Sequence, residues 1–144
     1  MSSPFLYYRI DTLSDLKRSS SYSVSSLDWH ADLAMILKFY SLFNKTVNPS
    51  GFDRYVGSPL AIIQDGSIVS FAIPLSFREG ETEIGGVATD PGRQNKGYCK
   101  ALISEMAFRI LAKGKAATLT TEKDNIPMQR AAEAIGMTRM LKDT

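Results

Sequence analysis

Residues 85–102, GGVATDPGRQNKGYCKAL, carry the strongest structural signal in this chain. The first part ends an apolar, β-branched segment that predicts a strand at Thr82–Thr89. The last part begins a segment with apolar residues at helical spacing, which predicts a helix at Tyr98–Ala112. The loop between them contains Gly92, Gly97 and basic residues. A strand, a tight loop and a helix N-terminus in this order offer backbone N–H groups and a helix dipole to a bound anion.

Two nucleotide-binding motifs are close to this loop, and the residues exclude both. A nucleotide P-loop, G-x-x-x-x-G-K-[ST], has its glycines at the separation of Gly92 and Gly97. It then requires Lys and Ser or Thr, where this chain has Tyr98 and Cys99, so the phosphate-binding amine and the magnesium-binding hydroxyl are missing. The dinucleotide fingerprint G-x-G-x-x-G is absent, and the strands before the loop are predicted to be antiparallel.

Positive charge is concentrated in the part of the chain that begins near this loop. Residues 1–90 hold 7 Lys and Arg against 10 Asp and Glu, a balance of −3, whereas residues 91–144 hold 10 against 5, a balance of +5. A polyanionic ligand would be attracted to the C-terminal part. A solvated basic surface is the alternative interpretation of the same charges.

Length and composition indicate a single folded domain over residues 1–144. Apolar residues make up 44% of the chain and charged residues 22%, as in ordinary globular proteins. No apolar run is long enough for a membrane span, and the N-terminus lacks the pattern of a secretory signal. One cysteine and one histidine exclude an intrachain disulfide and the usual zinc sites. We therefore expect a cytoplasmic protein without a metal ion.

The remaining segments predict alternating strands and helices. They are a strand at Phe5–Ile10, a short helix at Asp11–Leu16 with Thr12 or Ser14 as N-cap, a loop at 18–26, a long helix at Ser26–Lys45 with Ser25 or Ser26 as N-cap, a hairpin of Leu60–Gln64 and Ser67–Phe77 around Asp65-Gly66, a strand at Ala116–Thr121 and a helix at Asn125–Ile135. Pro74 predicts a bulge or an unpaired edge, and Gly85 and Gly86 predict a bulge or a close approach. This order is typical of one mixed α/β domain.

The chain resembles the GNAT superfamily of N-acetyltransferases over nearly its whole length. Gln94–Cys99, QNKGYC, is similar to the acyl-CoA signature [QR]-x-x-G-x-[GA], with a cysteine in the last place. GGVATDP resembles the end of the family's fourth strand and the turn after it. The segment from Asn125 to Met137 is similar to the second family motif, an Asn after strand five and a helix that ends in Gly-Phe. The opening YYRIDTLSDL resembles the family's first strand and helix.

The resemblance implies a central, mostly antiparallel sheet that splays between strands four and five, with flanking helices. It also implies that acetyl-CoA binds in the gap, with its pyrophosphate on the N–H groups of the signature loop and its pantetheine arm along strand four. The implied binding residues are Val87, Ala88, Thr89, Gln94, Asn95, Lys96, Gly97, Tyr98, Cys99, Lys100 and Asn125. Within this set we interpret Tyr98 as a packing residue. We interpret Cys99 as a small residue that fits the loop and not as a nucleophile, although a helix N-terminus can lower the pKa of a thiol.

The implied reaction is direct transfer of the acetyl group from the thioester to a primary amine in a ternary complex. The amine must lose a proton before it attacks, and Glu83 is the candidate base. The backbone N–H of Val87 or Ala88 is the candidate donor to the tetrahedral oxyanion. Family members often have a tyrosine as general acid seven residues after the Asn, where this chain has Ala132. A domain that binds coenzyme A without turnover therefore stays open as the alternative.

The sequence limits the acceptor to a small-molecule or peptide amine and does not identify it further. Acidic residues in the variable segment, Asp28, Asp32 and Asp53, suggest a cationic amine, with ordinary surface carboxylates as the alternative. They also argue against the third possibility, that the predicted helix at Ser26–Lys45 binds nucleic acid.

The C-terminal segment is short for the family. Members usually carry two more strands after the last helix, and residues 138–144 can form at most one. This leaves the predicted strand at Ala116–Thr121 exposed or covered by a partner chain, so we expect a possible homodimer as one arrangement.

Overall fold

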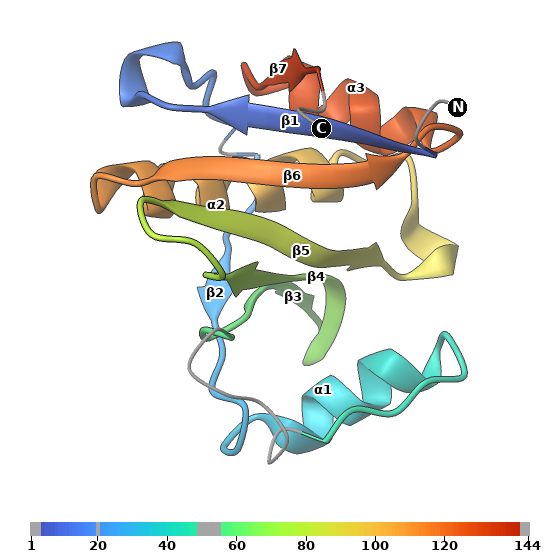
Figure 1. Ribbon diagram of the computed structural model, residues 1–144. Coiled ribbons are helices and arrows are strands. Elements are labelled where there is room, and N and C mark those ends of the chain that lie inside the picture. Colours follow the sequence, from blue (N-terminus) through green and yellow to red (C-terminus); the bar gives the residue numbers. More distant parts are fainter. Residues whose placement is uncertain (1–3, 20, 49–55, 142–144) are drawn as a thin grey trace.

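The computed structural model describes residues 4–19, 21–48 and 56–141 and has a mixed α/β fold (Figure 1). One seven-stranded sheet has the order β2-β3-β4-β5-β6-β1-β7. The strands are β1 (Phe5–Ile10), β2 (Ser25–Ser26), β3 (Leu60–Gln64), β4 (Ser67–Leu75), β5 (Glu81–Thr89), β6 (Ala116–Glu122) and β7 (Thr138–Met140). The helices are α1 (Leu33–Ser41), α2 (Tyr98–Ala112) and α3 (Ile126–Ala134), with 3-10 turns η1 (Leu13–Asp15) and η3 (Pro91–Arg93). Within the described residues no helix is long and apolar enough to cross a membrane.

α2 and α3 cover one face of the sheet, and α1 covers the other face only beside β4, because the strands alternate apolar side chains between two cores (Figure 1). Tyr8, Ile84 and Leu119 point to the face covered by α2 and pack in one cluster with Leu102. On the other face, Phe71 of β4 packs in a second cluster with residues of α1. The site therefore lies in a scaffold whose two faces are supported by different helices.

The sheet splays between β5 and β6. These are the fourth and fifth of the strands predicted from the sequence, so the splay lies where the resemblance implies. These two strands pair in parallel only over Glu81–Glu83 with Ala116–Thr118. Beyond Glu83, β5 continues to Thr89 against β4 and, in the described part of the chain, has no pairing with β6. The result is a V-shaped gap whose vertex lies at Glu83.

A bulge shapes the free arm of this V, which is the segment of β5 beyond Glu83. Phe71 of β4 pairs with Ala88 and Ile73 pairs with Gly85, so β5 has one residue more than β4 in this interval. Gly86 takes a φ of 56°, a left-handed conformation that favours glycine. A Cβ on Gly85 would lie 2.5 Å from a methyl group of Leu75. Both predictions for this glycine pair, a bulge and a close approach, are confirmed.

The predicted second hairpin strand, Ser67–Phe77, ends at Leu75 as β4. The register shift between Phe71 and Ile73 lies beside Pro74, and β3 pairs no further along β4 than Ala72. Pro74 has no N–H to donate to β3, which fits a position where that ladder has already ended.

The edge of β6 is covered by the chain itself, which corrects the expectation that it is exposed or paired with a partner. β1 pairs antiparallel with β6 from Phe5 opposite Glu122 to Ile10 opposite Ala117. The short C-terminal strand β7, the single strand that the sequence allows, then pairs with β1. The sequence could not show this because pairing between the first strand and one more than 100 residues later leaves no local pattern.

The prediction of a long helix over Ser26–Lys45 is wrong in its extent. The helix is α1, Leu33–Ser41, and its N-cap position is Asp32, not Ser25 or Ser26. Ser25 and Ser26 form β2 and pair with β3. The carboxylate of Asp28 accepts hydrogen bonds from the N–H groups of His30 and Ala31, which forms a separate turn before the helix.

Candidate functional site

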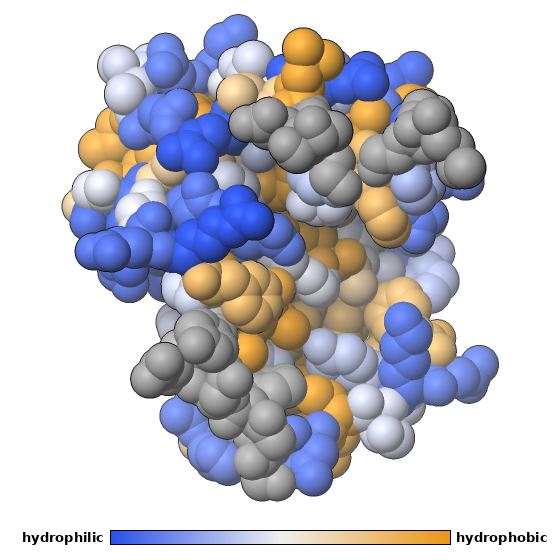
Figure 2. Space-filling view, viewed as in Figure 1, coloured by the Kyte–Doolittle hydropathy of each residue, from blue (hydrophilic) through white to orange (hydrophobic). Residues whose placement is uncertain are grey.

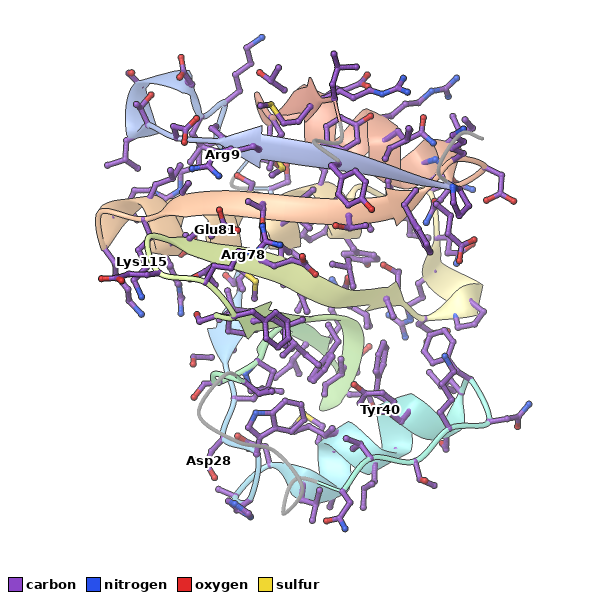
Figure 3. The ribbon with its side chains drawn as sticks, in the orientation of Figure 1. Arg9, Asp28, Tyr40, Arg78, Glu81 and Lys115 are labelled. Atoms are coloured by element: carbon purple, nitrogen blue, oxygen red, sulfur yellow. The ribbon has the colours of Figure 1, made fainter. Side chains whose placement is uncertain are left out.

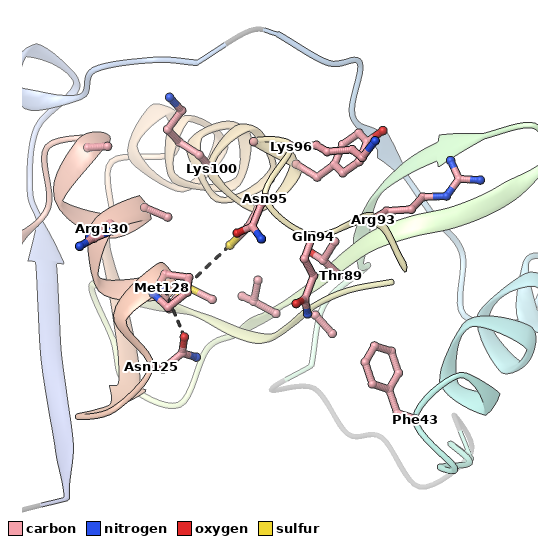
Figure 4. Close-up of a pocket in the computed structure, with 18 residues that line it drawn as sticks. Phe43, Thr89, Arg93, Gln94, Asn95, Lys96, Lys100, Asn125, Met128 and Arg130 are labelled. Carbon is pink, nitrogen blue, oxygen red and sulfur yellow. Dashed lines mark hydrogen bonds between the residues drawn. The ribbon is translucent and has the colours of Figure 1, made fainter. Parts of the chain in front are cut away.

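A pocket of about 730 Å³ opens where the signature loop, the end of β5 and the starts of α2 and α3 meet (Figure 4). All eleven residues that the resemblance implies for cofactor binding line it: Val87, Ala88, Thr89, Gln94, Asn95, Lys96, Gly97, Tyr98, Cys99, Lys100 and Asn125. They come from three separate elements, and the fold brings them to one place.

The sequence missed further lining residues, among them Phe43, Met128 and Arg130. Met128 and Arg130 lie on the first turns of α3, and the helical pattern after Asn125 could have indicated them. Phe43 follows α1 and reaches the pocket from a distant part of the fold, so no sequence signal marks it (Figure 4).

The N-terminus of α2 is suited to bind an anion. Gly97 is the N-cap residue, with a φ of 81°, and no side chain caps the helix there. Its carbonyl accepts the hydrogen bond from the N–H of Ala101, at 3.1 Å. Helix geometry leaves the preceding N–H groups of the first turn without acceptors within the helix. These donors and the positive end of the helix dipole lie at the pocket.

Two tyrosines and a glutamine hold the loop in position. The Tyr22 hydroxyl donates to the carbonyl oxygen of Lys96 at 2.7 Å, and its ring lies 4.4 Å from that of Tyr98, centroid to centroid. The Tyr98 hydroxyl and the Arg93 guanidinium both donate to Oε1 of Gln64, at 3.1 and 3.2 Å. Tyr98 is therefore committed to packing, as the sequence interpretation held.

The electrostatics of the pocket favour a polyanion. Its lining includes the cations Arg93, Lys96, Lys100 and Arg130, and none of its described lining residues is acidic. Arg93 also lies 3.8 Å from a carboxylate oxygen of Asp90, which offsets part of its charge. The other three positive side chains surround a helix N-terminus, so the basic charge seen in the sequence is gathered at one site.

The free arm of the V offers a backbone edge to the pocket. The N–H of Asp90 donates to the Val69 carbonyl of β4, and the Ala88 carbonyl, which also turns toward β4, accepts a hydrogen bond from the Ser70 hydroxyl. Because alternate residues of a strand face opposite edges, Val87 and Thr89 turn their backbone groups toward the gap. Val87 packs against the α2-side core and Ala88 against the α1-side core, so the pocket reaches the gap between the two faces.

Asn125 and Cys99 form the junction between α2 and α3. Oδ1 of Asn125 accepts a hydrogen bond from the N–H of Met128 at 3.3 Å and caps α3. The Cys99 thiol lies 3.9 Å from the Met128 sulfur, and both contacts are drawn in Figure 4. Burial raises the pKa of the Cys99 thiol to about 11, so the helix N-terminus does not lower it. A neutral thiol supports the interpretation of Cys99 as a small packing residue.

Glu83 lies outside this pocket. It lines a separate hollow of about 450 Å³ together with Glu81 of β5 and with residues of β1, β4, β6 and β7, including Arg9. Arg9 and Glu81 are labelled in Figure 3, on the face turned away from α2. Burial raises the pKa of the Glu83 carboxyl, the negative charge of Glu81 adds to the rise, and Arg78 opposes it. A carboxylate with a raised pKa binds a proton more tightly than an ordinary glutamate does.

Family members often have a tyrosine as general acid at the position of Ala132, so this position carries no hydroxyl in this chain. Ala132 is fully buried in the core and does not line the pocket, whereas Ala131 and Ala134 of the same helix do. Among the described lining residues Tyr98 carries the one phenolic hydroxyl, and that hydroxyl is already bonded to Gln64.

A mixed sheet splayed beside a helix N-terminus is the fold of the acyl-CoA N-acyltransferase class. The model of the acetyltransferase (GNAT) family matches residues 22–137, and the chain belongs to this family. A comparison of the sequence with curated proteins finds no significant match.

Solved structures agree on the fold. A GNAT-family protein from Novosphingobium aromaticivorans is 22% identical, with a TM-score of 0.75 over 96% of this chain and 60% of its own. The ribosomal-protein-S18-alanine N-acetyltransferase of Escherichia coli is 21% identical, with a TM-score of 0.65 over 79% of this chain and 76% of its own. A GNAT-family acetyltransferase from Colwellia psychrerythraea is 13% identical, with a TM-score of 0.72 over 94% and 52%. The chain thus spans little more than half the length of the first and third of these proteins.

Proposed function

We propose that this protein transfers an acetyl group from acetyl-CoA to a primary amine. The observation that supports this most directly is the uncapped N-terminus of α2, which opens on a pocket lined by four cations and joined to the splay beyond Glu83. A helix N-terminus with basic side chains around it binds a pyrophosphate. The gap beside β5 has the amide edge that an extended pantetheine arm requires.

Different groups of the pocket bind different parts of acetyl-CoA. The N–H groups at the start of α2 hold the pyrophosphate, and Lys96, Lys100 and Arg130 balance its charge. The backbone of Val87 and Thr89 pairs with the amides of the pantetheine arm, as an added strand would. Asn125 keeps its Nδ2 available for the same arm, since its Oδ1 caps α3.

The residues on β5 then supply the chemistry. Glu83 takes one proton of the ammonium, and the freed amine nitrogen attacks the thioester carbonyl carbon. The carbon–sulfur bond then breaks to release the thiolate, and the nitrogen gives its second proton to solvent. The Val87 N–H, which faces the gap, donates to the oxyanion. Glu83 and Val87 are four positions apart, at most about 13 Å along the strand, so the proton passes through bound water. The thiolate takes its proton from solvent, because position 132 is alanine.

A CoA-binding domain without turnover is the second candidate. The observation that favours it is the buried Ala132, together with the engaged hydroxyl of Tyr98, which leaves the thiolate without a protein acid among the described residues of the pocket.

The test is a thermal-shift titration with acetyl-CoA, CoA and ATP, followed by an assay of CoA release with a panel of amines. A ligand at 100 times its Kd stabilises the folded state by about 2.7 kcal/mol, which raises the Tm by several degrees for a chain of this size. Stabilisation by both CoA compounds but not by ATP supports the binding site. Turnover with an amine supports the enzyme, binding without turnover supports the second candidate, and no shift with any CoA compound rejects both.

A further inference from the structure

The hollow that contains Glu83 lies over the vertex of the splay, on the face opposite α2. Across the sheet, Leu75 pairs with Glu83, Glu83 with Thr118, and Thr118 with Arg9, so these four side chains share one face. Two residues further along, Thr120 pairs with Tyr7 on the same face, where β5 has already left β6. The floor of the hollow therefore adjoins the gap in the sheet.

Ion pairs leave one carboxylate of the hollow available. Nη1 of Arg9 lies 2.8 Å from Oε2 of Glu81, and its Nε lies 2.8 Å from Asp11, so Glu81 is neutralised (Figure 3). The Glu83 carboxylate forms neither an ion pair nor a hydrogen bond with any residue of the described segments. Arg78 also lines the hollow and balances the remaining charge. The hollow thus presents one acceptor carboxylate in surroundings with no net negative charge.

Apolar side chains form the rest of the hollow. Leu75 and Phe77 stand on the β4 side, and Tyr7 and Met140 on the β1 and β7 side. Phe77 is 61% exposed and Met140 is 44% exposed, which is high for side chains of this size in a folded protein. Figure 2 shows apolar atoms in the recessed middle of this face, with strongly hydrophilic side chains to their left.

We propose that this hollow binds the acceptor, and that the acceptor is a primary amine with a single positive charge on an aromatic or alkyl body. The inference rests on the proposed acetyl transfer. Glu83 attracts the ammonium through the bound water that carries its proton, and Phe77, Leu75 and Met140 cover the apolar body.

The same charges select against polycations. Two arginines face two glutamates in the hollow, so a polyamine or a lysine-rich peptide finds no acidic groove for its further charges. Two of the acidic residues that suggested a cationic acceptor, Asp28 and Asp32, are not among the described residues that line the hollow. Asp28 and Asp32 accept hydrogen bonds from backbone N–H groups near α1, and Asp53 lies outside the described residues.

The test is calorimetric titration of the protein, saturated with CoA, with 2-phenylethylamine, ethylamine and spermidine. We expect 2-phenylethylamine to bind about tenfold or more tightly than either of the others, because its ring is removed from water against Phe77. Phe77→Ala should weaken that binding about tenfold and leave ethylamine unchanged. Leu13→Ala is the matched control, since Leu13 is a 47% exposed apolar residue away from the hollow.

Binding of spermidine tighter than that of 2-phenylethylamine, or an equal effect of Phe77→Ala and Leu13→Ala, would overturn the inference. Met140→Ala provides a second variant on the opposite wall, with the same expected direction. The measurement needs no turnover, so failure of the amine preference is distinct from failure of acetyl transfer, which the acetyl-CoA shift and CoA release report separately.

Discussion

The pocket at α2 and the hollow at Glu83 lie on either side of one splay but are built differently. The pocket relies on backbone groups, namely a helix N-terminus and the edge of β5, with long cations around them. The hollow relies on side chains from five strands. A backbone site depends on conformation and tolerates many side chains, whereas a side-chain site depends on the identity of each residue. The pocket should therefore follow the family, and the hollow should define what is particular to this protein.

The largest expected effect is on kcat. A substitution of Glu83 distinguishes the role of the hollow from that of the pocket. Glu83→Gln removes the proposed base and should lower kcat about 100-fold or more with the preferred amine. The thermal shift with acetyl-CoA should stay unchanged, because Glu83 does not line the pocket. The acid limb of the kcat/KM profile, where activity rises with pH as Glu83 loses its proton, should disappear in the variant. Equal activity of the variant and the wild type would remove Glu83 from the mechanism, with Glu79→Gln in the exposed turn as control.

The second effect concerns the pocket. Gly97→Asp places a carboxylate where the pyrophosphate is proposed to bind, and should weaken acetyl-CoA binding about tenfold or more by charge repulsion. Gly114→Asp is its matched control at the other end of α2, since both glycines have φ near 80° and no atom within 4 Å of an added Cβ. Both variants carry the same backbone strain. Equal losses of acetyl-CoA binding, measured by calorimetry, would show that the effect comes from the fold and not from the anion site.

A smaller effect is expected in the pH dependence of stability. Burial raises the pKa of Glu83 above its ordinary value of 4.5, so the folded protein binds this proton more tightly than the unfolded chain does. The free energy of unfolding of the wild type therefore falls as pH rises through the interval between those two pKa values. Glu83→Gln cannot titrate, so it should gain stability relative to the wild type between pH 4 and pH 7. Urea titrations of the wild type and the variant at pH 4 and pH 7 measure this. If the difference in the free energy of unfolding between the two proteins is the same at both pH values, the burial of the Glu83 charge is contradicted.

The smallest effect is expected at Cys99. With a pKa of about 11 its thiol is protonated at pH 7.5, and it should react with iodoacetamide far more slowly than it does in the unfolded protein. Cys99→Ser should change kcat by less than about twofold, since no step uses the thiol. A loss of activity comparable to that of Glu83→Gln, with folding intact, would make Cys99 a participant in the chemistry.

Local patterns predicted most of the fold correctly. The hairpin around Asp65-Gly66, the strand–loop–helix at Thr82–Ala112 and the helix after Asn125 all form close to their predicted bounds. The pocket residues were implied by the resemblance to the GNAT superfamily, and all of them except Asn125 lie in a strand, loop and helix N-terminus that are adjacent in the chain. The helix at Ser26–Lys45 was overextended because Leu27 and Trp29 continue its apolar pattern while packing in the α1-side core before the helix begins.

The sequence by itself determined the secondary elements around the splay, the anion-binding loop and the basic charge of its C-terminal part, because each depends on residues within a few positions of one another. Only the tertiary structure decided that β1 covers β6, that Arg9 neutralises Glu81 and that Glu83 stands unpaired at the vertex of the gap. These arrangements join residues that lie from 35 to 117 positions apart in the chain. They follow from how the strands order themselves in the sheet, which is a property of packing across the whole domain and not of any one segment.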